Sequence, residues 1–244
     1  GKPALGVGPG NGPVYIEKTA NILRAVNDLV LSKTFDNGMI CATENSAVID
    51  TDIYAEVKKQ LVKNGVFFVE KKDQAKLAEA MFNPKTCAVK GPIAGKSAKV
   101  IAKLAGIKVP DNTKVLAAEI NGVGPKYPLS AEKLSPVISI YKAKNHEEGF
   151  KLCDELLHFG GMGHTAGIQT LDDDLALKFG EQMKAARVLV NTPGGFGGLG
   201  NLYNEMTPSL TLGTGSWGAN SISHNVTDYD LLNIKTIAKR RNNM

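Results

Sequence analysis

Short runs of β-branched residues alternate along the chain with stretches in which apolar residues recur every three or four positions. The runs predict strands at 14–16, 46–50, 66–69, 114–118, 137–141, 164–169 and 187–191. The stretches predict helices at 21–32, 52–63, 74–81, 97–104, 146–157 and 172–185. Strands that alternate with helices over short links predict an α/β fold, a mostly parallel sheet flanked by helices. In such sheets we expect ligands outside the carboxyl ends of the strands.

Two parts of the chain lack this clear pattern. Residues 192–220 hold eight glycines, in PGGFGGLG and TLGTGSWGAN, and predict irregular loops of the kind that often carry function. The basic tail 231–244 is ambiguous between a helix and an edge strand. The first helix, at 21–32, has Thr19 as a candidate N-cap.

Composition narrows the class of protein. The 244 residues are 43% apolar and 22% charged, which is ordinary for a folded domain and excludes disorder as the main state. A net charge of +5 is too dilute to predict a nucleic-acid partner, and no apolar run approaches the ~18 residues of a membrane span. The three cysteines have no metal-site spacing and are odd in number, so we expect no metal and a reducing, cytoplasmic location.

Cys41 is the cysteine best placed for chemistry. It stands in FDNGMICATEN, on the link between a predicted helix and a predicted strand, where a thiol can be exposed as a nucleophile. A structural role stays open on these residues alone. Cys87 and Cys153 fit structural roles better, and Cys153 lies on the apolar face of its predicted helix.

Three further positions could serve a site. His164 follows four residues, GGMG, at the start of a strand, which suits a general base, a ligand contact or a buried structural histidine equally. Glu132 precedes a strand in SAEKLSP, where a carboxylate is most often solvated. The glycines around Gly8 in GVGPGNGP allow close backbone approach to a phosphate or nicotinamide group, although a plain turn explains them as well.

Six motifs together identify a family resemblance. In chain order they are GVGPGNGPVYIEK, FDNGMICATEN, EKLSPVISIYKA, GGMGHTAGIQT, RVLVNTP and PSLTLGTGSWGANSIS. Over about residues 1–241 the chain resembles the CoA-acylating aldehyde dehydrogenase part of the bifunctional aldehyde–alcohol dehydrogenases, within the aldehyde dehydrogenase superfamily. The resemblance implies an enzyme of fermentation and alcohol metabolism that reversibly converts an aldehyde, CoA and NAD to acyl-CoA and NADH. Acetaldehyde and acetyl-CoA are the expected pair.

The resemblance also implies a role for each site residue. Cys41 matches the nucleophile that forms a thiohemiacetal with the aldehyde and then a thioester. Glu132 matches the glutamate that binds the nicotinamide ribose, and His164 matches a histidine lining the cofactor and CoA side. Gly8 matches a glycine beside the nicotinamide, and Leu212, in SLTLG, matches an apolar position of the same cleft.

One departure from the wider superfamily bears on the acyl acceptor. Hydrolytic members carry a glutamate that activates water, whereas the equivalent stretch here, residues 5–11, contains no carboxylate. Water without a positioned base is a poor attacker, and a thiol ionises far more easily. Coenzyme A is therefore the expected acceptor. A hydrolytic aldehyde dehydrogenase and a non-catalytic assembly module remain as alternatives.

The resemblance divides the chain into three parts. Residues 1–12 correspond to the end of an NAD-binding domain that is otherwise absent, 13–225 to the catalytic domain, and 226–244 to a tail. LNIKTIAKR in that tail resembles the segment that pairs with a neighbouring subunit, so a homo-oligomer or filament is expected. We expect little turnover from this chain alone, because the NAD-binding domain and part of the oxyanion hole lie upstream in the family.

Overall fold

The computed structural model describes residues 4–242 and contains a seven-stranded sheet in which every pairing is parallel. The strand order is β3-β4-β5-β2-β1-β6-β7. The strands are β1 (Pro13–Ile16), β2 (Ser46–Asp50), β3 (Val66–Phe68), β4 (Val115–Glu119), β5 (Val137–Ala143), β6 (Gly163–Gln169) and β7 (Ala185–Val190). The helices are α1 (Ile22–Thr34), α2 (Thr51–Lys63), α3 (Lys71–Met81), α4 (Ala98–Leu104), α5 (His146–Gly160), α6 (Asp173–Gln182) and α7 (Gly194–Leu199). The predicted α/β fold is confirmed, with each predicted element found near its expected ends.

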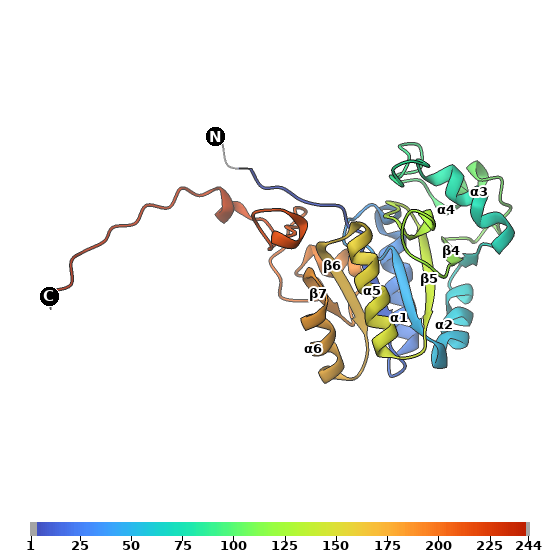
Figure 1. Cartoon of the computed structure of the whole chain (residues 1–244), viewed down its shortest axis with the longest axis horizontal. Helices are drawn as coiled ribbons and strands as arrows, with labels where there is room; N and C mark the ends of the chain where they lie inside the picture. Colours follow the sequence, from blue (N-terminus) through green and yellow to red (C-terminus); the bar gives the residue numbers. More distant parts are fainter. Residues whose placement is uncertain (1–3, 243–244) are drawn as a thin grey trace.

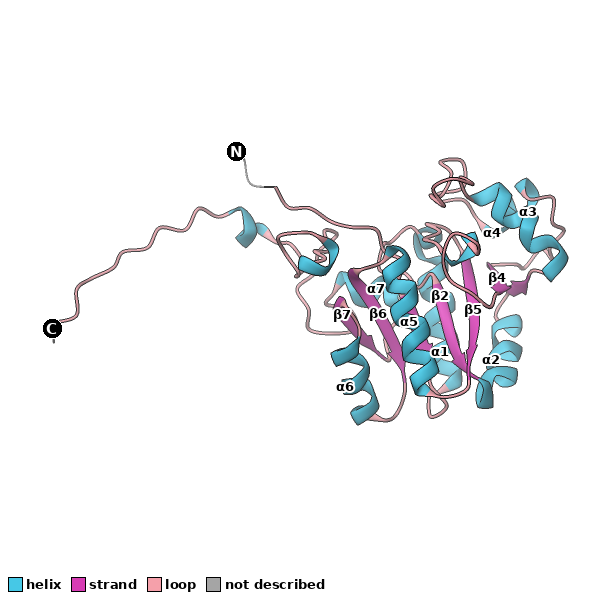
Figure 2. Cartoon of the chain, in the orientation of Figure 1, coloured by secondary structure: helices cyan, strands magenta, loops and turns pink. Residues whose placement is uncertain are grey.

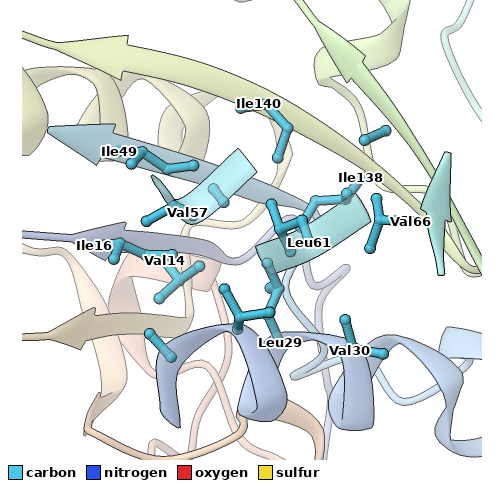
Figure 3. Close-up of a cluster of buried hydrophobic side chains, with 14 of the residues drawn as sticks. Val14, Ile16, Leu29, Val30, Ile49, Val57, Leu61, Val66, Ile138 and Ile140 are labelled. Carbon is cyan, nitrogen blue, oxygen red and sulfur yellow. The ribbon is translucent and has the colours of Figure 1, made fainter. Parts of the chain in front are cut away.

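Helices cover both faces of the sheet. Figure 1 shows α5 and α6 in front of the strands and α1 behind them. Along β1 the side chains alternate between these faces, as a period of two requires: Val14 and Ile16 join the core beneath α1 and α2, whereas Tyr15 joins the core beneath α5 and α6. Figure 3 shows the first of these clusters, with Leu29 of α1 and Leu61 of α2 directed at the strands. A third cluster packs α3 and α4 on β4 and β5.

Three local expectations need correction. The N-cap of α1 is Asn21, whose side chain accepts from the Arg24 amide, while Thr19 bonds instead to the Glu17 carboxylate. The glycine-rich region contains a short helix, α7, in addition to loops. The tail is neither helix nor strand from 232 to 242, and it extends away from the body of the molecule (Figure 1).

No helix within residues 4–242 combines the length and the apolar character needed to cross a lipid bilayer.

Candidate active site

The candidate residues gather at the amino ends of the strands, not at the carboxyl ends where ligands were expected. Gly8 precedes β1, Cys41 precedes β2, Glu132 precedes β5 and His164 opens β6. These four strands are neighbours in the order β5-β2-β1-β6 and run parallel, so the segments that lead into them lie side by side. Figure 2 shows the loops that gather at this upper end of the sheet.

The carboxyl ends of β1 and β6 are closed by the chain's own polar groups. The Thr170 hydroxyl donates to the Glu17 carboxylate at 2.9 Å, and the Thr19 amide donates to the same oxygen at 2.9 Å. The Asn191 side chain donates to the Thr170 carbonyl at 2.8 Å. The carboxyl ends of these two strands are thus bonded to one another by the chain's own side chains, whereas the candidate residues lie at the opposite ends of the strands.

Cys41 lies in a segment that we call the nucleophile loop, residues 39–45. The loop is held from three sides by Asn45, whose side chain donates to the Gly10 carbonyl at 2.6 Å and accepts from the Lys133 amide at 2.9 Å. The Lys133 ammonium donates to the Asn45 carbonyl at 2.9 Å. Gly10 packs so closely that an added Cβ would overlap the Cys41 carbonyl oxygen. The thiol is therefore half-buried on a tightly fixed backbone.

Glu132 faces the nucleophile loop across the same glycine. The Gly10 amide donates to Glu132 Oε1 at 2.7 Å, and burial raises the pKa of this half-buried carboxyl. Burial also raises the pKa of Cys41, and the negative charge of Glu132 raises it further. The Arg187 guanidinium acts in the opposite direction on that thiol pKa.

His164 is fully buried at the start of β6. Its Nδ1 lies 2.9 Å from the Thr165 hydroxyl, and its Nε2 has no hydrogen-bond partner. Burial, with the nearby Arg187 charge, lowers the pKa of His164 to about 4. The ring is therefore neutral at pH 7, and its Nε2 is closed off from solvent.

Gly8 and Leu212 lie near the other candidate residues. Gly8 packs against the segment 212–220, and Leu212 belongs to that segment. A Cβ added at Gly8 would lie 3.5 Å from the Thr214 side chain. Leu212 is buried, and one of its methyl groups would lie 3.7 Å from a Cβ added at Gly198, a position that abuts Ala42 of the nucleophile loop. The structure thus brings all five predicted residues to one edge, where Cys41 and Gly8 lead into β2 and β1, the two central strands of the four.

Several buried charges at this edge were missed by the sequence analysis. Lys33, Glu44 and Lys133 are buried beneath the nucleophile loop, and burial lowers the pKa of Lys33 to about 8. Glu44 accepts from the Gly194 amide at the start of α7, at 2.6 Å, which is a favourable place for a carboxylate. Arg187 was included in the predicted strand RVLVN without a role. It could have been recognised as a charged residue inside an otherwise apolar strand.

Within residues 4–242, no three His, Cys, Asp or Glu side chains come together as a metal-ligand set. The three cysteines are free thiols; Cys153 is buried in the core beneath α5, and Cys87 is half-buried.

Comparison with known proteins gives consistent likenesses. The family model "Aldehyde dehydrogenase family" matches residues 2–201. The aldehyde-alcohol dehydrogenase of Streptococcus pneumoniae serotype 4 is 49% identical over 251 residues, covering 100% of this chain and 28% of its own length. The bifunctional aldehyde-alcohol dehydrogenase AdhE of Escherichia coli K12 is 45% identical over 248 residues, with the same two coverages. An acetylating aldehyde dehydrogenase from Geobacillus thermoglucosidasius matches in structure with a TM-score of 0.95 and 43% identity, over 100% of this chain and 53% of its own.

Proposed function

Because the chain belongs to the aldehyde dehydrogenase family, we propose that it carries the catalytic site of an NAD-dependent, CoA-acylating aldehyde dehydrogenase. The observation that carries this proposal is the contact between Gly10 and Cys41. The segment that contains Gly10, residues 5–11, has no carboxylate to activate water. The nucleophile of the second half-reaction is then a thiol, that of coenzyme A, for which no such base is needed. The structural relative named as acetylating supports the same acceptor.

The Cys41 sulfur is the nucleophile of the first step and the leaving group of the last step. The Cys41 thiolate attacks the aldehyde carbon and forms a carbon–sulfur bond, which gives a thiohemiacetal. A bound nicotinamide cofactor supplies the hydride acceptor that turns this adduct into a thioester. The thiol of coenzyme A, on losing its proton, attacks the thioester carbon, and Cys41 leaves as the thiolate. The same steps in reverse reduce acyl-CoA to the aldehyde.

The residues around Cys41 fit the nicotinamide end of such a cofactor. Glu132 has one oxygen held by Gly10, which orients the carboxylate and leaves the other oxygen for a ribose hydroxyl. Gly8 has no side chain to obstruct a flat ring. We place the His164 ring, whose buried Nε2 has no hydrogen-bond partner, on the cofactor and CoA side, and the buried Leu212 side chain behind the same cleft. We propose NAD as the cofactor, and acetaldehyde with acetyl-CoA as the substrate pair.

The proposal extends to the whole protein. The chain spans about 28% of the length of the curated relatives it matches, which supports an NAD-binding domain as a partner of residues 13–225. Residues 1–12 would then end that domain, and residues 226–244 would serve in assembly of a homo-oligomer in the cytoplasm. We expect slow turnover from this chain alone, because the Cys41 amide offers a single oxyanion donor and loss of one donor lowers rates by about 10²–10³.

Mass spectrometry after incubation with acetyl-CoA, without a nicotinamide cofactor, tests the acylating role. This half-reaction needs the thiolate and a place for CoA but no hydride transfer. The expected result is an acetyl group on Cys41, with Cys87 and Cys153 unmodified, and no adduct in Cys41→Ser.

Two outcomes would contradict the proposal. The absence of an adduct in a chain whose Cys41 is still alkylated readily would show an exposed thiol with no CoA site, as a non-catalytic assembly module would have. Release of free acetate from the adduct in the absence of CoA would favour the hydrolytic alternative.

A further inference from the structure

Arg187 is a buried cation that the proposed chemistry leaves without a role. It is 4% exposed, on β7. Both Nη atoms donate to the Gly213 carbonyl, Nη1 at 2.9 Å, and Nη1 also donates to the His164 carbonyl at 3.3 Å. Its Nε has no partner, and no carboxylate forms an ion pair with it in the part of the chain that the structure describes. Burial of a guanidinium without an anion is costly, so the site holds a positive charge that an anion would stabilise.

The fold links Arg187 to the nucleophile loop through Thr165 and Gly12. Arg187 pairs in register with Thr165 on β6. A Cβ added at Gly12 would lie 3.0 Å from the Thr165 carbonyl oxygen and 4.0 Å from that of Ala42, so Gly12 separates the strand from the loop by a single residue. Ala42 is the neighbour of Cys41 in sequence.

A second set of contacts links Arg187 to the nucleophile loop through Gly213 and Leu212. Gly213, which accepts both Nη groups, follows Leu212. A Cβ at Gly198 would meet Leu212 on one side and Ala42 on the other. The Gly213 carbonyl, which holds the guanidinium, thus belongs to the residue after Leu212, whose side chain packs at Gly198 together with the nucleophile loop.

The charges around the thiol compete. Glu132 raises the pKa of Cys41 and Arg187 lowers it, while Cys41 in turn raises the pKa of Arg187 against the burial that lowers it to about 10. His164, also within reach of Arg187, is neutral at pH 7.

Other charged groups lie farther out. Lys33 and Lys133 lower the pKa of Glu132, and Lys33 lowers that of Glu44. On the other side of Arg187, the side chains that line a cavity with it include Glu205 and the bonded pair His224 and Asp230.

We propose that Arg187 is a positioning residue for the nucleophile, whose fixed, buried guanidinium stabilises the thiolate form of Cys41. This inference rests on the proposed function, in which Cys41 is a thiolate twice: before it attacks the aldehyde, and when coenzyme A displaces it. A fixed positive charge that acts on the sulfur favours both states. The same charge opposes protonation of His164 and so keeps its ring neutral. Two carbonyl acceptors hold the guanidinium in place before any substrate binds.

The rate of Cys41 alkylation by iodoacetamide as a function of pH tests the proposal. Arg187→Gln is expected to raise the apparent pKa of the reaction by about one unit, which slows alkylation about tenfold at pH values below that pKa. Arg187→Lys keeps a positive charge and is expected to recover most of the rate. Arg24→Gln, which removes an exposed guanidinium at the start of α1, is the matched control and should leave the profile unchanged.

An unchanged alkylation profile in a folded Arg187→Gln chain would overturn the proposal. If that variant does not fold, the wild-type chain and Glu132→Gln provide a second measurement, with negatively charged iodoacetate compared with neutral iodoacetamide. The ratio of iodoacetate to iodoacetamide rates at Cys41 should rise in Glu132→Gln, where the opposing carboxylate is removed, to a value above that at Cys87. A ratio at Cys41 that stays no higher than at Cys87 in Glu132→Gln would overturn the proposal.

These readouts need neither CoA nor NAD. Failure of acetyl transfer to Cys41 with a retained effect of Arg187→Gln would count against the acylating function and leave the role of Arg187 intact.

Discussion

At the scale of single residues, the nucleophile depends on polar groups that are not themselves reactive. Asn45 is the clearest case, because one side chain joins the segment before β1, the nucleophile loop and the segment before β5. It lies buried among apolar strands, so each of its hydrogen bonds replaces water that cannot enter.

Asn45→Ala is expected to lower the free energy of unfolding by about 2–6 kcal/mol. It leaves the Gly10 carbonyl and the Lys133 amide buried without their partners, at about 1–3 kcal/mol for each unsatisfied group. Urea denaturation measures the change. Asn64→Ala is the control, since Asn64 bonds a carbonyl at the exposed end of α2 and should change stability by less than about 0.5 kcal/mol. Equal effects of the two substitutions would contradict this account of Asn45.

His164 gives the fold a defined dependence on pH. Its pKa is about 4 in the folded chain and near the usual 6.5 when unfolded, so the unfolded chain binds more protons between those values. Stability is therefore lost as the pH falls from about 6.5 towards about 4. Between pH 7 and pH 5 the loss from this group is about 2 kcal/mol.

The pH effect is checked by urea denaturation at pH 7 and pH 5. His164→Gln should reduce the difference in stability between the two conditions by about 2 kcal/mol. His158→Gln, which removes an exposed histidine of α5, should leave most of the difference in place. A pH dependence that survives His164→Gln unchanged would show that His164 is not held neutral by the fold.

At the scale of elements, α7 buttresses the nucleophile loop. Its glycines allow backbone contact that side chains would prevent: a Cβ at Gly194 would lie 2.8 Å from the Ala42 carbonyl oxygen, and one at Gly198 would overlap the Ala42 methyl. The first amides of the helix also bind inward, with Gly195 donating to the Ser32 hydroxyl at 2.8 Å. A glycine-rich helix is weak by propensity, so packing and these bonds stabilise it.

Gly198→Ala is expected to displace Ala42 and lower stability by about 1–3 kcal/mol, as overpacking does in well-packed interiors. It should also change the rate at which Cys41 is alkylated. Gly180→Ala provides a matched glycine on α6, where an added Cβ would meet nothing closer than 4.0 Å. That control should raise stability by about 0.5–1 kcal/mol through helix propensity. Thermal unfolding and alkylation of both variants measure the contrast, and a stabilised Gly198→Ala chain would contradict the buttress role.

At the scale of the whole molecule, the site lies on one edge of the sheet and the tail projects from the body. The tail exposes large apolar side chains, with Leu231 at 78%, Ile234 at 82% and Ile237 at 85%. Extended backbone with open hydrogen-bonding groups and apolar side chains is suited to pairing with another strand.

Removal of residues 228–244 is therefore expected to lower the mass of the particle in solution, as measured by light scattering. The double variant Ile234→Ser with Ile237→Ser is a milder test that keeps the chain length and should shift the mass in the same direction. Full-length and shortened chains that both scatter as single copies would contradict self-association through the tail.

The sequence alone was sufficient for the order and type of the elements, because the periodicity of apolar residues is a local property. The prediction of Cys41, Glu132 and His164 as site residues came from the six ordered motifs taken together, because the residues around each one alone left a structural role open. The observed boundaries of α1 and α3 differ from the predicted ones by a few residues, because capping residues and local hydrogen bonds decide where a helix begins and ends.

Only the tertiary structure decided which edge of the sheet holds the site and which charges surround it. That edge depends on the pairing of β1 with β2 and β6, and hydrogen bonds such as the one between Glu44 and Gly194 join residues 150 positions apart. No local pattern records such a contact. The buried Lys33 and Arg187 read as ordinary charges along the chain, and they acquire their altered pKa values only where packing excludes water.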